Sequence, residues 1–195
     1  FQLEEHINHV KFRVKFLLDN LMQPSNFNIK ISPEIISFIE DLSNQIKIIE
    51  RKEIIKINTK MIVEKVLSPS DVGFHNTLID DNIMNFIDFE YAGWDDPSKM
   101  ISDLILQPDY NIPIENIKVL NVFFHVKFLP DDFQVRIPIM LKLYRIKWII
   151  IMLNPLLKEQ ICLSKTDIET IHERVVDYSN ESNLRISNSL NQLLN

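Results

Sequence analysis

The chain is short of cysteine and glycine. Cys162 is the single cysteine in 195 residues, so no disulfide can form within the chain and no zinc site can be built from cysteines. We expect Cys162 to be a small buried hydrophobic residue. Gly73 and Gly93 are the two glycines, and both lie between Leu67 and Pro97. Because glycine serves where a backbone turns sharply or is closely approached, this window is predicted to hold a site.

Basic charge and long apolar runs are scarce as well. The chain has 21 Lys and Arg against 27 Asp and Glu, a formal net charge of -6. Phosphate contacts supply most of the affinity of nucleic-acid binders, so a nucleic-acid partner is disfavoured. The longest apolar run, Trp148 to Leu153, is far shorter than the roughly 20 residues that cross a bilayer, and no signal peptide is apparent. We expect a cytoplasmic protein without a membrane partner.

Most of the chain has the spacing of apolar residues that is typical of α-helices. Hydrophobic residues make up 46% of the chain, enough for the core of one domain. They recur every three or four residues, and Ser32 followed by Pro33 is a typical helix start. The pattern predicts a mainly α-helical domain over residues 1–195, with helices at 3–21, about 33–50, 98–106, 114–128 and 137–153, and one starting near 166.

One segment in the middle departs from this pattern. Two short apolar runs, 77–79 and 83–87, flank the turn-forming residues Asp80-Asp81-Asn82. This arrangement predicts a small β-hairpin at about 76–88. A turn centred on Asp81 would place Ile79 opposite Ile83.

Oxygen ligands gather at the open end of this predicted hairpin. The same register places Asn76 opposite Phe86 and so close to Asp88, and Asp71 precedes Asn76 by only five residues. Carboxylate and amide oxygens suit a hard cation such as Mg²⁺, which commonly binds a substrate phosphate as well. The hairpin is therefore predicted to carry a magnesium site for phosphate chemistry.

Two segments here resemble a known enzyme family. Asp71-Val72-Gly73-Phe74-His75-Asn76 resembles the D-x-x-x-x-N catalytic loop of the aminoglycoside phosphotransferase and choline kinase families, distant relatives of protein kinases. Ile87-Asp88-Phe89-Glu90-Tyr91-Ala92-Gly93-Trp94-Asp95-Asp96-Pro97, followed by Asp103, resembles the I-D-x-E-Y-A-G-x-x-D-P segment and the helical aspartate that come next in those enzymes. The resemblance implies the C-terminal lobe of a protein-kinase-like fold.

The resemblance also implies roles for individual residues. Asp71 would be the catalytic carboxylate that accepts the proton of a substrate hydroxyl. Asn76 and Asp88 would hold the Mg²⁺ ions that bridge the phosphates of ATP or GTP. Structural support of the site would come from Gly93, Asp96 and Asp103.

The chain departs from the family in two places. Pro69-Ser70 stands where the family has His-Gly before the catalytic aspartate. Nothing before Leu67 resembles a nucleotide lobe, and the first fifty residues contain no glycine. We therefore expect a single C-terminal lobe, without its N-terminal nucleotide lobe in this chain.

Two hypotheses follow. The first is a small-molecule kinase that phosphorylates a hydroxyl of a small substrate. The acidic balance would suit a cationic substrate such as an amino sugar or an amino alcohol. The second is a catalytically inactive binding or scaffolding module that has kept the fold.

Other polar residues have simpler interpretations. Asp80, Asp81 and Asp95 are expected to be turn or surface carboxylates. His6 and His9 lie three residues apart without a nearby carboxylate cluster, and we expect them to be solvated or packed rather than metal-bound.

Overall fold

The structure is a computed structural model that describes residues 3–22, 31–53, 65–71, 73–81, 83–113, 115–116, 133–157 and 163–193. Within these ranges the chain is mainly helical with two small antiparallel sheets, which is an α+β arrangement. Cys162 and nearly all of the predicted helix at 114–128 lie outside the described residues. Among the described residues, no helix combines the length and the apolar content needed to cross a membrane.

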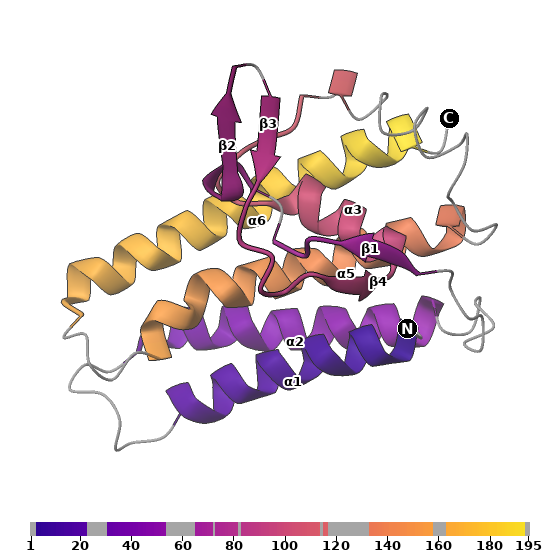
Figure 1. The fold of residues 1–195 in the computed structure, drawn as a ribbon. Coiled ribbons are helices and arrows are strands. Elements are labelled where there is room, and N and C mark those ends of the chain that lie inside the picture. Colours follow the sequence, from indigo (N-terminus) through magenta and orange to yellow (C-terminus); the bar gives the residue numbers. More distant parts are fainter. Residues whose placement is uncertain are drawn as a thin grey trace.

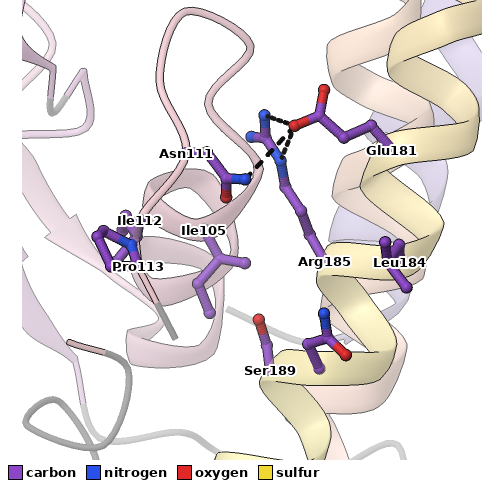
Figure 2. A pocket seen from close by; sticks show the side chains of 9 residues that line it. Ile105, Asn111, Ile112, Pro113, Glu181, Leu184, Arg185 and Ser189 are labelled. Carbon is purple, nitrogen blue, oxygen red and sulfur yellow. Dashed lines mark hydrogen bonds and ion pairs between the residues drawn. The ribbon is translucent and has the colours of Figure 1, made fainter. Parts of the chain in front are cut away.

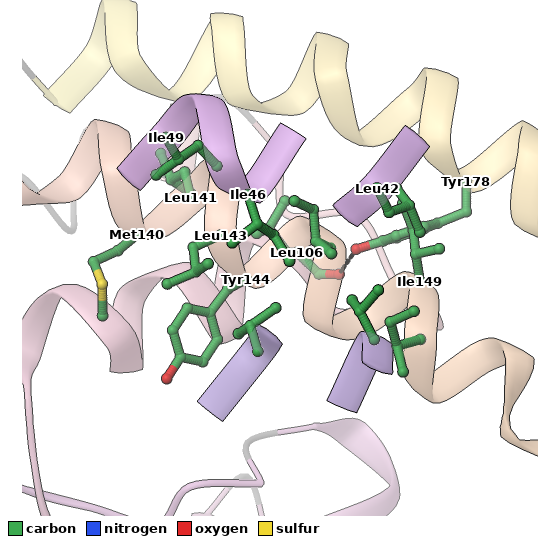
Figure 3. Close-up of a cluster of buried hydrophobic side chains, with 14 of the residues drawn as sticks. Leu42, Ile46, Ile49, Leu106, Met140, Leu141, Leu143, Tyr144, Ile149 and Tyr178 are labelled. Carbon is green, nitrogen blue, oxygen red and sulfur yellow. Dashed lines mark hydrogen bonds between the residues drawn. The ribbon is translucent and has the colours of Figure 1, made fainter. Parts of the chain in front are cut away.

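Helix α5, Phe133–Leu153, is the centre of the fold (Figure 1). It contacts α1 (Leu3–Leu21), α2 (Pro33–Glu53), α3 (Pro97–Leu106) and α6 (Lys165–Leu193). A helix that is apolar on nearly all sides must be buried on nearly all sides. Figure 3 shows the resulting core, in which the Tyr178 hydroxyl donates to the Leu106 carbonyl at 2.6 Å. The side chains of this core are buried at Leu42, Ile46, Met140, Leu141, Leu143 and Ile149.

The first two helices confirm the sequence prediction. α1 has the predicted bounds, and α2 begins at Pro33 with the Ser32 hydroxyl accepting from the Ile35 amide at 3.4 Å. An ion pair between Lys11 and Glu50 at 2.7 Å joins the two helices at their partly exposed edge.

Helix α5 is longer than predicted, and α6 begins close to its predicted start and extends into the polar tail. α5 begins at Phe133 rather than Ile137, and so has Pro138 inside its second turn. α6 continues through the polar tail to Leu193, since Ile186 and Leu193 stay buried on its inner side. A short 3-10 turn, η2 (Asn154–Leu157), separates α5 from the segment before α6.

The predicted hairpin is confirmed, but its predicted register is wrong. Strands β2 (Thr77–Asp80) and β3 (Ile83–Phe86) pair antiparallel. Ile79 lies opposite Met84, not Ile83. The loop has two residues rather than three, and Asp81 at φ 45° takes the left-handed conformation that such tight turns require. The hairpin projects away from the helices (Figure 1).

A second small sheet was not predicted. β1 (Val66–Ser68) pairs antiparallel with β4 (Gly93–Asp95), and Ser68 lies opposite Gly93. This pairing places the loop that follows Ser68 beside the start of α3. Strands of three residues are too short to show alternation in a sequence, which explains why the pairing was missed.

Candidate functional site

An open groove lies where α1, α3 and α5 meet the loop after β1. It consists of two adjoining hollows of about 530 and 580 Å³. His9, Ser70, Tyr91 and Lys99 line both hollows, and Asp71 lines the second. The predicted catalytic carboxylate therefore lines this groove.

Local hydrogen bonds hold the loop that carries Asp71. The Ser70 amide donates to the Ser68 hydroxyl at 3.0 Å, and Ser70 itself has φ 62°. The side-chain amide of Asn76 donates to the Asp71 carbonyl at 3.0 Å. His75 Nε2 lies 3.5 Å from Asp71 Oδ2, with both side chains almost half exposed. The Asp71 carboxylate is thus positioned by its backbone and remains open to solvent.

The two glycines of this window differ in their need for a missing side chain. A Cβ on Gly73 would lie 2.4 Å from His75 Cε1, so Gly73 permits the close approach of the His75 ring. A Cβ on Gly93 would meet nothing within 4 Å, and no glycine has a positive φ. The expectation that both glycines are needed for a turn or close approach is therefore wrong for Gly93, whose open side lines the groove.

The hairpin brings Asn76 and Asp88 to one end. The Ile87 amide donates to the Asn76 carbonyl at 2.9 Å, which extends the ladder past β2 and β3. Asp88 follows at φ 62° with an exposed side chain. Glu90 raises the pKa of Tyr91 by hydrogen bonding and charge, and Asp88 and Asp71 raise it further. Both aspartates therefore act on one phenol, which lines the groove.

The oxygen atoms at this end suit a hard cation in kind, but they are few. The Asn76 amide nitrogen is used by Asp71, which leaves the carbonyl oxygen of the side chain as the ligand atom. Among the described residues there is no group of three or more His, Cys, Asp or Glu that could hold a metal alone. Mg²⁺ commonly binds few protein ligands together with substrate phosphates. Asn76 and Asp88 fit Mg²⁺ in this arrangement alone.

Asp96 is the anchor between β4 and α3. It is fully buried and caps α3, where its carboxylate accepts from the Ser98 amide at 2.8 Å. Its other oxygen pairs with Arg136 of α5, which is also fully buried. A buried charge with a buried partner fixes the position of the strand that lines the groove.

Asp95 and Asp103 form a second ion network with two lysines. The prediction that Asp95 lies at the surface is wrong, because it is 6% exposed and pairs with Lys99. Asp103 pairs with Lys99 at 3.3 Å and with Lys147 at 2.8 Å. Burial lowers the pKa of Lys99, but Asp103 and Asp95 outweigh burial and raise it overall. The network keeps Lys99 charged along one wall of the groove.

His6 of α1 is buried beside these ion pairs. Its Nδ1 lies 2.8 Å from the Tyr144 hydroxyl, and its Nε2 lies 3.7 Å from Asp96. Burial lowers the pKa of His6 to about 4, against the opposing charges of Asp96 and Asp95. The approach to Asp96 is therefore not an ion pair at neutral pH, and Arg136 balances the carboxylate.

Sequence reasoning missed most of these buried polar groups. Arg136, Tyr144 and Lys147 are polar positions within a helix whose pattern is otherwise apolar. Such residues are rarely buried without partners, so Arg136 and Lys147, two of the four cations in α5, were a signal of buried carboxylates elsewhere in the chain. The carboxylates lie at Asp96 and Asp103, the two positions that the resemblance implied as structural support.

Comparison of the chain with protein-family models, with curated proteins and with solved structures finds no match. A functional assignment depends on the groove and its residues.

Proposed function

We propose that the groove belongs to a phosphotransferase of the protein-kinase-like kind, and that the chain is its C-terminal lobe. The observation that carries the proposal is the hydrogen-bonded link between the candidate base and the candidate metal ligands. Asn76 bonds to the Asp71 backbone through its side chain and to Ile87 through its carbonyl, and Asp88 comes next. These bonds link the Asp71 loop to the two residues proposed as metal ligands, and Asp71 lines the groove.

Each group has a defined task in phosphoryl transfer. The Asp71 carboxylate accepts the proton of the acceptor hydroxyl as the new oxygen–phosphorus bond forms and the bond from the γ-phosphorus to the β-phosphate oxygen breaks. The Asp71 side chain is 41% exposed, which leaves it accessible to a substrate. Asn76 and Asp88 would hold Mg²⁺, which when bound neutralises charge on the phosphate oxygens of ATP or GTP.

The acceptor would occupy the groove between α1 and α5. Tyr91 and Trp148 offer aromatic surface on its walls, and Asp109 and Asp71 offer carboxylates. Arg13, Lys99 and Lys147 also line it, and the two lysines are paired with Asp95 and Asp103. The aromatic rings and the carboxylates of Asp109 and Asp71 would suit a small hydroxyl-bearing substrate with an amino group, such as an amino sugar or an amino alcohol. Burial and the charge of Asp71 raise the pKa of Tyr110 to about 12, so its phenol stays a neutral hydrogen-bond donor.

Transfer of labelled γ-phosphate from ATP and GTP tests the proposal in the full-length protein with a panel of amino sugars and amino alcohols. Asp71→Asn and Asp88→Asn should each lower the rate by at least about 100-fold without lowering the melting temperature. Asp80→Asn is the matched control, since Asp80 is an exposed carboxylate at the far end of the same hairpin. Rates in the first two variants that equal the control rate would refute the assignment.

A binding or scaffolding role is the second candidate, and the hairpin favours it. One face of the hairpin carries Ile79, Met84 and Phe86, which are 70%, 50% and 46% exposed. Exposed apolar clusters of this kind commonly mark interaction surfaces. Absence of a melting-temperature shift with Mg²⁺ and ATP in the full-length protein, together with absence of phosphate transfer, would favour this role.

A further inference from the structure

A separate small pocket lies between α3 and α6. It is enclosed by α3, by residues 111–113 and by α6, and has a volume of about 140 Å³ (Figure 2). Ile105, Ile112 and Leu184 form its apolar walls. Its polar groups come from Asn111, Glu181, Arg185, Asn188 and Ser189.

Ser189 has a buried hydroxyl without a hydrogen-bond partner. The residue is fully buried, and its Oγ makes no hydrogen bond. Other serines of α6 behave differently: Ser182 donates to the Tyr178 carbonyl at 2.6 Å, and Ser187 donates to the Asn183 carbonyl at 3.2 Å. Figure 2 shows the Ser189 hydroxyl directed into the space between α3 and α6. Since buried polar atoms normally have partners, this atom points to a molecule that occupies the pocket.

The charges at the pocket cancel. Arg185 is 8% exposed, and its guanidinium donates to Glu181 at 2.7 Å and to the carbonyls of Gln107 and Tyr110 at 2.9 and 3.1 Å. Asn111 also approaches Glu181 at 3.5 Å. An anion would meet the Glu181 carboxylate, and a cation would meet the Arg185 guanidinium, so the chemistry favours an uncharged ligand.

We propose that this pocket binds a small uncharged polyol. The volume is close to that of cavities that hold a benzene-sized molecule, which corresponds to about six non-hydrogen atoms. Hydroxyl groups both donate and accept, as do the Ser189 hydroxyl and the side-chain amides of Asn111 and Asn188. The carbon chain of the polyol would lie against Ile105 and Leu184.

The pocket and the groove are separate, but one residue, Gln107, links them. Arg185 holds the Gln107 carbonyl on one side, and the Gln107 side chain lines the groove on the other. A polyol at Ser189 would thus lie behind the segment that forms part of the groove wall. The proposal does not rest on phosphotransferase activity, because its argument uses only the pocket.

Titration of the ¹⁵N-labelled full-length protein with glycerol and with erythritol tests the proposal by NMR. We expect saturable shifts of the side-chain amides of Asn111 and Asn188, with millimolar affinity. Ser189→Ala should weaken binding about 2- to 10-fold, as expected for the loss of one hydrogen bond. Ser187→Ala, which removes an exposed hydroxyl of the same helix, should leave the affinity unchanged.

A second readout separates loss of binding from loss of folding. Without polyol, Ser189→Ala should melt at or above the wild-type temperature, because the variant removes a buried hydroxyl that lacks a partner. Shifts that do not saturate, or that are equally weakened in Ser187→Ala, would overturn the proposal. So would an affinity that Ser189→Ala leaves unchanged, which would mean that the polyol binds at another place.

Discussion

The buried histidine His6 makes a quantitative prediction about acid sensitivity. Its pKa is about 4 in the folded protein, while an unfolded histidine titrates near its ordinary value of 6.5. The unfolded state therefore binds the proton more tightly between these two values. The contribution of neutral His6 to the free energy of unfolding is fully present above about pH 6.5, and it falls as the pH drops toward 4. Between pH 7 and pH 5 the loss amounts to about 2 kcal/mol.

Urea unfolding at pH 7 and at pH 5 measures this loss. Other groups titrate over the same range, so the informative quantity is the pH-dependent loss in wild type minus the loss in His6→Gln. We expect this difference to be about 2 kcal/mol. His172→Gln is the control, because His172 packs edge-on against Phe38 of α2 and not against the buried carboxylates near His6. An equal pH-dependent loss in wild type and in His6→Gln would show that His6 does not stay neutral in the fold.

Three further predictions concern the two glycines, the start of α6 and the buried ion pair of Arg136 with Asp96. Gly73→Ala should displace the His75 ring and lower activity, while Gly93→Ala should leave the melting temperature unchanged, as thermal melts and activity assays would show. Ser164→Ala should destabilise the protein by about 1 kcal/mol in urea titrations, since Ser164 caps α6. Arg136→Met should cost about 3–5 kcal/mol by the same measurement, because it leaves a buried carboxylate unpaired. An Arg136→Met variant as stable as wild type would contradict the buried pair.

Most of the helical framework could be predicted from the sequence. α1, α2 and α3 follow directly from apolar spacing and from Ser32 and Pro33, because local periodicity and capping determine them. The polar tail by itself did not decide how far α6 extends. The extension depends on burial of Ile186 and Leu193, which is a property of the packed fold.

The hairpin beside the candidate site could be predicted from the sequence, but its register and surroundings could not. The Asp80-Asp81-Asn82 triplet gave the hairpin, while the register depended on a left-handed Asp81, which the composition of the turn did not reveal. Burial of Asp95 depends on Lys99 within α3, which lies one helical turn away and lines the groove. Some aspartates of this short segment are exposed and others are buried. Which of them are buried depends on cationic partners that the local sequence does not identify.

The most direct test of the account is whether Asn76 and Asp88 form a cation site beside Asp71. Mn²⁺ added with a non-hydrolysable ATP analogue to the full-length ¹⁵N-labelled protein should broaden the signals of the Asn76 side-chain amide and the Asp88 backbone first. Excess Mg²⁺ should reverse the broadening, and Asn183 on α6 should remain sharp at the same concentrations. Broadening that leaves Asn76 and Asp88 unaffected, or that Asp88→Asn does not weaken, would contradict the account.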